Sequence, residues 1–221
     1  VGYQYILGQQ HGYGKCDGAK SNCTIDGVTI YNSVAKQTTD KWYAKTTLAS
    51  TDSVKVADAI YCNDRSASST QTSAWASTGV VYYYGAYERL TGTTQNPILT
   101  CPTASDKFTV NTSNGNGALT YPVGLITADE LVMAGNKYNT SNQTLYLYSN
   151  SFFASGTPSH YDSEAPSTFY QTEGSSSGGF NNVPAGSGFR PPVFSTRPVI
   201  SLSSNVKLSG NGTYDNLYIV E

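Results

Sequence analysis

Residue types that serve in hydrolysis occur at two places in the second half of the chain. Residues 174–178 (GSSSG) match the G-x-S-x-G pattern of a nucleophile elbow, and residues 159–162 (SHYD) hold the types of a Ser-His-Asp triad in a row. An elbow lies between a buried strand and a helix, but Ser, Gly and Asn flank this match. Triad members come from separate places in a fold, whereas neighbours in an extended loop point to alternate sides. Neither stretch predicts a catalytic centre, and His160 is expected on an exposed contact surface.

Four cysteines are the next candidates for chemistry, at positions 16, 23, 62 and 101. An even number in a polar, secreted-looking chain favours two disulfides, for which three connectivities exist. We prefer Cys16–Cys23, which closes a short loop, together with Cys62–Cys101, which closes a longer one. A zinc site is the rival interpretation, but the sequence has no C-x-x-C and neither histidine lies near a cysteine pair.

The acidic residues predict no dedicated cofactor site. Asp129 and Glu130 stand where the first turn of a helix begins, and capping and the helix dipole explain them there. Asp162, Glu164 and Glu173 could bind Ca²⁺ with nearby carbonyl groups, but their spacing fits no calcium loop. We therefore expect no cofactor, with a structural Ca²⁺ as the alternative.

Five Asn-x-Ser/Thr tripeptides begin at Asn22, Asn111, Asn139, Asn142 and Asn211. Such tripeptides are acceptors for N-linked glycans in secreted proteins. In a bacterial chain they would reflect only the abundance of Asn, Ser and Thr.

The composition of the 221 residues excludes some partners and favours others. Thirteen Lys and Arg against 15 Asp and Glu give a net charge of −2, without the basic cluster that nucleic acid requires. No run approaches the roughly 18 apolar residues of a membrane span. The 18 Tyr among many Ser, Gly and Asn residues are typical of extracellular proteins and of antibody contact surfaces. Because the chain starts at Val1 within a strand-like pattern, we expect a processed fragment whose anchor or export signal lies upstream.

Two helices are expected. Residues 38–50 form the first, with Thr39 or Asp40 as its cap and with Trp42 and Tyr43 on its apolar side. The second begins at Thr127, because Glu130 three residues on completes a capping box, and it ends at Gly135. Its buried side is expected to comprise Leu131, Val132 and Met133. Residues 54–58 add a short helical turn.

Short strands account for most of the remaining pattern, so the fold class is α+β. Residues 62–100 are interpreted as loop-like, apart from the aromatic run 80–84, which is either a strand or a rigid buried loop. Residues 114–117 (NGNG) predict a turn. The expected strands are the alternating Tyr3-x-Tyr5-x-Leu7, the run around Val28 and Ile30, and residues 145–148, 197–202 and 218–220.

The segment 151–195 departs from the rest of the chain. It contains no Leu, Ile, Met or Lys, but it holds six of the seven Phe among many Ser, Gly and Pro residues. Six rings without aliphatic neighbours are hard to bury together, so we expect an exposed aromatic surface pinned by flanking strands. A disordered linker is the alternative.

Three stretches, in this order and spacing, resemble one family. They are residues 61–66 (YCNDRS), 117–130 (GALTYPVGLITADE) and 197–202 (RPVISL). The pattern is similar to that of bacterial surface proteins with a C-type lectin fold akin to formylglycine-generating enzyme, many of which carry pilin-like or secretion signals upstream. The resemblance implies one such domain over residues 1–221, displayed at the bacterial cell surface. The late cysteine pair that the oxidising enzymes need is absent, because no Cys follows Cys101, so the chain is not expected to be an enzyme.

In that family, and in variable proteins diversified by retroelements, the segment before the Arg-Pro-Val-Ile strand contacts the ligand. The resemblance thus implies that 151–195 is a variable segment binding a protein or another macromolecule, although the usual Trp near Phe153 is absent. The Ca²⁺-dependent sugar signature is also missing. A pilus or filament subunit that assembles through the same segment is the alternative. The expected contact residues are Phe153, His160, Tyr161, Asp162, Phe169, Phe180, Asn181, Asn182, Phe189, Arg190 and Phe194.

Overall fold

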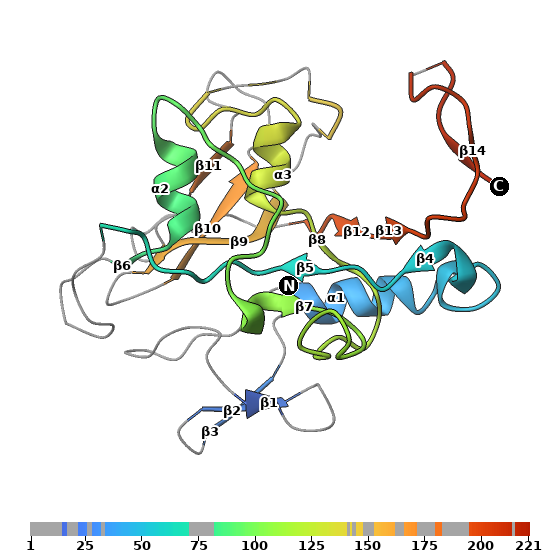
Figure 1. Ribbon diagram of the computed structural model, residues 1–221, viewed down its shortest axis with the longest axis horizontal. Coiled ribbons are helices and arrows are strands. Elements are labelled where there is room, and N and C mark those ends of the chain that lie inside the picture. The colour runs from blue at the N-terminus through green and yellow to red at the C-terminus, as the bar shows by residue number, and fades with distance from the viewer. Residues whose placement is uncertain are drawn as a thin grey trace.

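The computed structural model is a mixed α+β structure of short helices and short antiparallel strands in small sheets (Figure 1). None of the helices in its described part is long and apolar enough to span a lipid bilayer. The structure describes residues 15–16, 22–25, 28–31, 34–70, 82–140, 142, 145–147, 153–161, 166–171, 180–182, 195–213 and 215–221.

Three α-helices lie within these residues, one more than the sequence pattern predicts: α1 (Val34–Tyr43), α2 (Gly85–Thr91) and α3 (Ala128–Met133). Single 3-10 turns occur at Thr47–Ala49, Ser53–Lys55 and Ala104–Asp106. The strands are β1 (Lys15–Cys16), β2 (Asn22–Ile25), β3 (Val28–Tyr31), β4 (Val56–Ala57), β5 (Tyr61–Cys62), β6 (Tyr82–Tyr83), β7 (Lys107–Phe108), β8 (Gly124–Leu125), β9 (Phe153–Tyr161), β10 (Pro166–Gln171), β11 (Phe180–Asn182), β12 (Pro198–Val199), β13 (Ser201–Leu202), β14 (Leu208–Ser209) and β15 (Ile219–Val220).

The largest sheet has the order β11-β10-β9-β6, and all of its pairs are antiparallel. Three of its four strands come from residues 151–195, so the described parts of this segment form a sheet, where the sequence predicts an exposed aromatic surface. Helices α2 and α3 cover one face of this sheet (Figure 1). The segment is therefore part of the framework of the fold.

Short pairs elsewhere join distant parts of the chain. Strand β8 pairs with β12, β4 with β13, and β5 with β7. The strands predicted within 197–202 and near Val28 are confirmed as β12, β13 and β3. The strand expected at 145–148 is wrong over 145–147: Tyr146 and Leu147 form a turn, and Leu145 is buried in the core but lies in no strand.

Helix α1 begins four residues earlier than the sequence predicts and ends at Tyr43. Its buried stripe consists of Lys36, Thr39 and Tyr43, at spacings of three and four residues, which is the period of one helical face. Thr39 is thus an interior residue and not a cap, and Trp42 is largely exposed. The predicted start of this helix is wrong because it rested on an apolar side, whereas the buried stripe is mostly polar.

Helix α2 lies where a loop was expected. Ala86 and Leu90, four residues apart, are both fully buried against the sheet. The aromatic run before it is partly confirmed as a strand, because Tyr82–Tyr83 form β6. The spacing of Ala86 and Leu90 is the sequence signal that could have predicted α2. It is a weak signal, because two apolar residues in a helix of two turns barely define a period.

Helix α3 follows its local sequence closely. Thr127 accepts a hydrogen bond from the Glu130 amide while the Glu130 side chain accepts one from the Thr127 amide, so the predicted capping box is confirmed. Gly135, at φ +104°, and the bonds from its amide to the Val132 carbonyl and from Asn136 to Leu131 end the helix as expected. Leu131 is fully buried, but Met133 is half exposed and does not belong to the predicted buried side.

The main core lies between α2, α3 and the large sheet. The buried side chains that pack together are Ala86, Leu90, Ile126, Ala128, Leu131, Leu145, Phe153 and Phe180. A smaller cluster forms around Tyr61 and Leu119.

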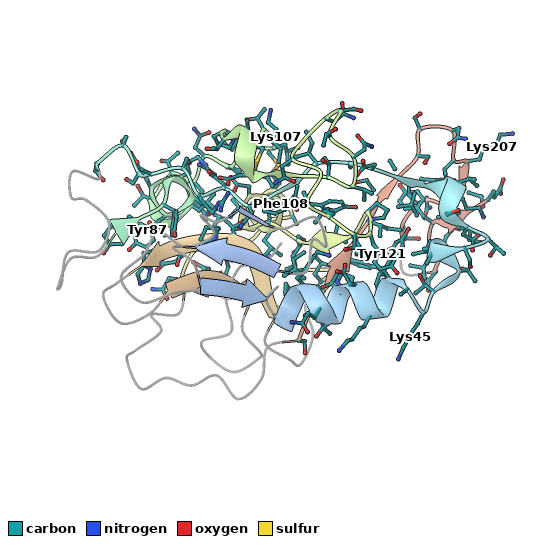
Figure 2. The ribbon with its side chains drawn as sticks, turned by 90° about the horizontal axis from the view of Figure 1, so that it is seen from below. Lys45, Tyr87, Lys107, Phe108, Tyr121 and Lys207 are labelled. Carbon is teal, nitrogen blue, oxygen red and sulfur yellow. A yellow bond between two sulfur atoms is a disulfide. The ribbon has the colours of Figure 1, made fainter. Side chains whose placement is uncertain are left out.

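The β14–β15 ribbon and the C-terminus lie at one end of the long axis, away from the large sheet (Figure 1). Figure 2 shows the same separation, with Tyr87 of α2 toward one end and Lys207 at the other. Several apolar side chains of this ribbon are exposed, among them Leu217, Tyr218 and Ile219.

Candidate functional site

Three of the eleven predicted contact residues are buried in the protein interior. Phe153 and Phe180 have no exposed surface, and His160 is 7% exposed. As exposed contacts for a ligand, these three predictions are wrong. Aliphatic residues of the helices, among them Leu90 and Leu131, pack with these two rings in one core cluster, although the segment itself supplies no aliphatic neighbours of this kind.

Each of the two buried Phe residues lies at the start of a strand of the large sheet. Phe153 starts β9, forms a bridge with Ser195 and lies 5.3 Å from the Arg197 guanidinium carbon. Phe180 starts β11 and bridges Tyr138, whose ring packs edge-on against it. These contacts hold both ends of the segment against the core.

His160 packs in an aromatic cluster near the end of β9. Its ring lies 5.7 Å from Tyr83 and 6.0 Å from Tyr87, and its Nδ1 lies 3.2 Å from the Ser159 hydroxyl. Because Ser159 is fully buried, this pair is enclosed by the protein. The contact is compatible with a packing role for both residues.

The backbone positions of four further contact residues are described. Tyr161 pairs with Pro166, Phe169 with Asn182, and Tyr170 with Asn181. The other four predicted contact residues lie outside the described residues: Asp162, Phe189, Arg190 and Phe194. Their role in contact stays a prediction. The G-x-S-x-G stretch and the three candidate Ca²⁺ ligands also lie outside the described residues.

The three stretches that carry the family resemblance meet in space, at what we call the three-segment junction: residues 61–66, 117–130 and 197–202. The Tyr61 hydroxyl donates to the Pro122 carbonyl at 2.8 Å, and a Cβ built on Gly124 would lie 2.3 Å from the Tyr61 ring. Strand β8 of the second stretch pairs with β12 of the third. Only glycine at 124 allows this approach of ring and strand.

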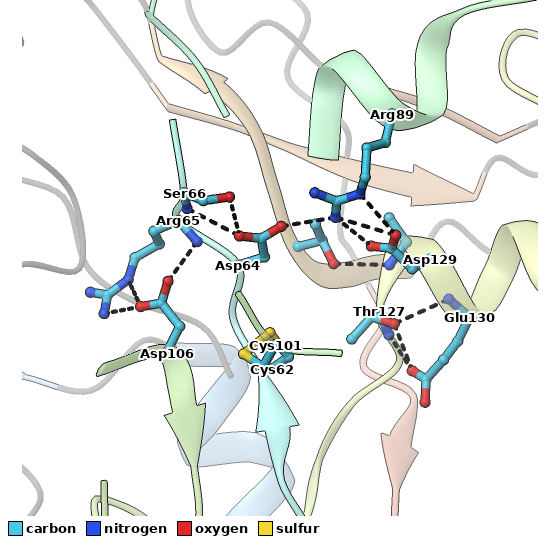
Figure 3. Close-up of a disulfide and its surroundings, with 12 residues drawn as sticks. Cys62, Asp64, Arg65, Ser66, Arg89, Cys101, Asp106, Thr127, Asp129 and Glu130 are labelled. Atoms are coloured by element: carbon cyan, nitrogen blue, oxygen red, sulfur yellow. Dashed lines mark hydrogen bonds and ion pairs between the residues drawn. A yellow bond between two sulfur atoms is a disulfide. The ribbon is translucent and has the colours of Figure 1, made fainter. Parts of the chain in front are cut away.

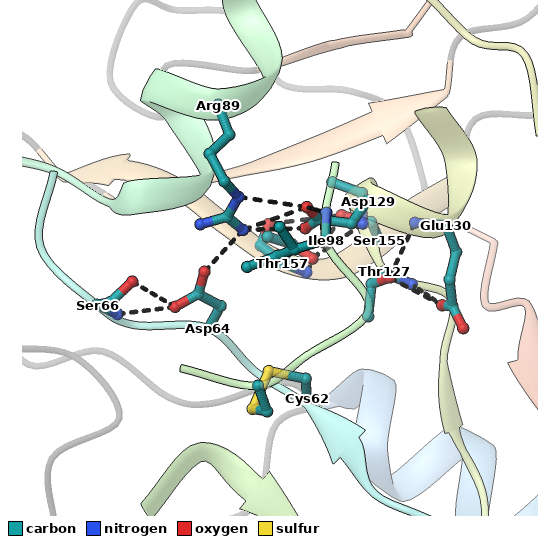
Figure 4. A network of polar contacts seen from close by, with 12 residues as sticks. Cys62, Asp64, Ser66, Arg89, Ile98, Thr127, Asp129, Glu130, Ser155 and Thr157 are labelled. Carbon is teal, nitrogen blue, oxygen red and sulfur yellow. Dashed lines mark hydrogen bonds and ion pairs between the residues drawn. A yellow bond between two sulfur atoms is a disulfide. The ribbon is translucent and has the colours of Figure 1, made fainter. Parts of the chain in front are cut away.

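Arg89 joins two of these stretches through a buried ion-pair network (Figure 4). Its Nη2 lies 2.8 Å from the Asp64 carboxylate and 3.2 Å from both Asp129 oxygens. Burial opposes the charge of Arg89, but the two carboxylates outweigh it and raise the pKa of the guanidinium. Asp129 also accepts the Ile98 amide at 2.9 Å, so its role extends beyond the expected dipole effect.

A second ion pair lies beside the disulfide (Figure 3). Asp106 accepts hydrogen bonds from the Arg65 backbone amide and guanidinium, and both side chains are buried. The predicted Cys62–Cys101 disulfide is confirmed, and both residues are half-buried. Cys16 and Cys23 are direct partners in the β1–β2 register, which is compatible with their predicted pairing.

Sequence reasoning missed Arg89 and Asp106 as framework residues. Arg89 lies in the helix that was interpreted as a loop, so its neighbours could not be foreseen. Asp64 and Arg65 were noticed only as letters of a motif, since nothing in their spacing predicts partners 25 and 41 residues away.

A cavity of about 80 Å³ opens beside the junction, room for about two or three water molecules. Asp64, Arg89 and Asp129 line it together with the disulfide residue Cys62 and the exposed Leu99. The acids that border it already accept hydrogen bonds from Arg89, from Ser66 or from backbone amides. Among the residues that the structure describes, no three His, Cys, Asp or Glu side chains are placed to hold a metal ion. The geometry of the Asp64–Arg89–Asp129 network suits a role in holding α2, α3 and the chain around Asp64 in position.

Comparisons with known proteins add no relative: no family model, no curated protein and no solved structure matches the chain.

Proposed function

We propose that this chain is an extracellular ligand-binding domain on a scaffold of the C-type lectin kind. In this proposal the contact surface is formed by residues of the strands β9, β10 and β11, by the segments that join them, and by residues 183–194, which follow β11. Its partner is a protein or another macromolecule, and the domain acts without catalysing a reaction.

The observation that carries the proposal is the full burial of Phe153 and Phe180 at the start of β9 and β11. Both rings pack in a core whose other members are Leu145 and residues in or beside α2 and α3. Strands held in this way can carry varied connecting sequences, because connecting segments contribute little to a core.

The connecting sequences have the composition of a contact surface. Residues 172–179 (TEGSSSGG) and 183–194 (VPAGSGFRPPVF) combine small polar residues and glycine with two Phe and one Arg. Aromatic and Arg side chains are the common energetic anchors of interfaces, and Ser and Gly adapt around them. Without the three buried residues Phe153, His160 and Phe180, the proposed contact residues are Tyr161, Asp162, Phe169, Asn181, Asn182, Phe189, Arg190 and Phe194.

The three-segment junction supports the scaffold part of the proposal. Residues 61–66, 117–130 and 197–202 were selected by resemblance alone, and they lie together around Tyr61, Gly124 and the β8–β12 pair. A shared framework with a variable segment between its last two motifs is the arrangement that the resemblance implies. A reverse transcriptase gene beside a near-copy of the region encoding 151–195 would support its diversification.

A binding screen tests the proposal. The labelled chain is applied to an array of extracellular proteins and glycans, and each hit is measured again with the triple variant Phe189→Ser, Arg190→Ser, Phe194→Ser. We expect the affinity to fall about tenfold or more, because loss of a single anchor commonly weakens binding by that factor.

The matched control is Val54→Ser with Leu99→Ser, which removes apolar side chains that are 74% and 71% exposed on the scaffold. This variant should bind like the parent chain. Binding that survives the triple variant in a folded chain would contradict the proposed surface.

A filament or pilus subunit is the second candidate, favoured by the exposed apolar residues of the β14–β15 ribbon. Exposed apolar patches on a protein mark contacts with other molecules. Sedimentation at rising concentration tests this candidate: assembly that Ile219→Ser abolishes would favour it, and a monomer at every concentration would not.

A further inference from the structure

The five sequons differ in what the fold leaves available for modification. In Asn111 the Nδ2 group donates to the Asp58 carboxylate, and the Asn111 backbone amide donates to the same group at 2.9 Å. In Asn142 the Nδ2 group donates to the Gly135 carbonyl at 3.1 Å. A transferase acting on the folded chain would first have to break these bonds.

Asn211 presents a different arrangement at the tip of the β14–β15 ribbon. All three residues of Asn211-Gly212-Thr213 are exposed. The Asn211 Oδ1 atom accepts bonds from the Thr213 amide at 3.1 Å and from the Thr213 hydroxyl at 2.8 Å. Within the described residues its Nδ2 donates no hydrogen bond, so no such bond has to break before this nitrogen reacts, and the Thr213 hydroxyl already contacts the side-chain amide.

An aromatic ring lies beside this tripeptide. Gly212 has φ +76°, and a Cβ built on it would lie 2.5 Å from Cε2 of Tyr218, so the ring packs directly against the middle residue. Tyr218 is 60% exposed, and its neighbours Leu217 and Ile219 are also exposed. The face of an aromatic ring packs favourably against C–H groups. A sugar ring carries such groups on one of its two faces. The ribbon thus offers an apolar surface that a glycan at position 211 would cover.

We propose that Asn211 is an N-glycosylation site of the folded chain, with Tyr218 as the surface on which the first sugar rests. The donor is an oligosaccharide linked to a polyprenyl pyrophosphate. Nδ2 forms a bond to the anomeric carbon, the bond from that carbon to the pyrophosphate oxygen breaks, and a base of the transferase takes the amide proton. The proposal is independent of the ligand-binding role, since it uses neither residues 151–195 nor the junction. It departs from the expectation that the sequons of a bacterial chain reflect composition alone.

The folded chain is incubated with a single-subunit oligosaccharyltransferase and its lipid-linked oligosaccharide, and an acceptor peptide in the same tube confirms that the enzyme is active. Occupancy is read for each sequon by mass spectrometry of peptides. We expect Asn211 to be modified about tenfold or more faster than Asn111 and Asn142, because each of those sites must first lose a hydrogen bond. In the reduced and denatured chain this difference should disappear.

Variants sharpen the test. Asn211→Gln and Thr213→Ala should abolish the fast modification, Thr213→Ser should retain it, and Asn111→Gln should leave it unchanged. Attachment of the glycan should slow nitration of Tyr218, measured on its own peptide. A modified acceptor peptide together with an unmodified Asn211, or equal rates at Asn211 and Asn111, would overturn the site; an unchanged nitration rate would overturn the role of Tyr218.

Discussion

Asp129 is one of the two carboxylates that pair with Arg89 in the ion-pair network. Its carboxylate binds Arg89, which is 17% exposed, and the Ile98 amide. We predict that Asp129→Asn lowers the free energy of unfolding by about 2–3 kcal/mol, because the partly buried guanidinium keeps its charge with one carboxylate fewer. Urea denaturation measures this loss.

The matched control for this prediction is Asp52→Asn. Asp52 also pairs with a basic residue, Lys55, but both side chains are about a third exposed. Exposed ion pairs contribute little to stability, so the free energy of unfolding of the control should fall by less than about 0.5 kcal/mol. Equal losses in the two variants would show that the buried network does not stabilise the fold.

Tyr61 gives a prediction about alkaline pH. Burial raises the pKa of its hydroxyl to about 12, above the value of about 10 in an unfolded chain. A raised folded-state pKa means that this contribution to stability is present below about pH 10 and is lost as the pH rises toward about 12. The loss for the parent chain is up to roughly 2 kcal/mol across this window.

Tyr61→Phe isolates the effect from the other tyrosines. At neutral pH this variant should be about 1 kcal/mol less stable, because the hydrogen bond to Pro122 is lost. Above about pH 10 the gap between parent and variant should close, as measured by urea denaturation at each pH. A gap that stays constant up to about pH 11.5 would contradict the assignment.

At the scale of elements, the capping box decides where α3 begins. Thr127→Ala removes the acceptor for the Glu130 amide, so we predict a loss of about 1 kcal/mol in the free energy of unfolding. Thr127→Ser keeps the acceptor and should lose much less. Thermal and urea unfolding of the two variants compare them, and equal losses would mean that the hydroxyl is not what stabilises the helix start.

Strand β11 depends on the burial of its first residue. Phe180→Ala should lower the free energy of unfolding by about 3–5 kcal/mol, because it leaves a cavity between the sheet and the helices. Leu217→Ala, at a side chain that is 52% exposed, is the comparison and should lose less than about 1 kcal/mol. If Phe180 were the exposed contact that its sequence context suggests, both losses would be small.

At the scale of the whole molecule, the Cys62–Cys101 disulfide limits the freedom of the unfolded chain. It joins residues 39 positions apart, and closing such a loop stabilises a fold by about 4 kcal/mol on entropic grounds. We predict that the double variant Cys62→Ser, Cys101→Ser loses about that amount in urea denaturation under oxidising conditions. Reducing agent should then have little further effect on the variant, apart from any effect at Cys16 and Cys23.

Features that depend on neighbouring residues could be predicted from the sequence. The capping box at Thr127 and the glycine stop at position 135 need only contacts within one or two turns. The same holds for the turn near Gly117, which has φ +65°. These features follow from local sterics and hydrogen bonding, so they do not depend on what packs around them.

The candidate site was less predictable, because burial is decided by residues far away in the chain. Phe153 and Phe180 stand among Ser, Gly and Asn, and residues distant in the sequence, such as Leu90 and Leu131, form the core cluster with them. Helix α2 escaped prediction because two apolar residues are too few to define a period, although they are sufficient once a sheet lies beneath them.

The sequence by itself determined the mixed α+β class, the start and end of α3, the late strands and the composition of the segment 151–195. Only the tertiary structure decided which of that segment's aromatic residues belong to the core, and it alone brought Arg89 between Asp64 and Asp129. The physical reason is that hydrogen bonding within a turn is a property of adjacent residues, whereas exclusion of water from a ring or an ion pair requires several distant segments at once.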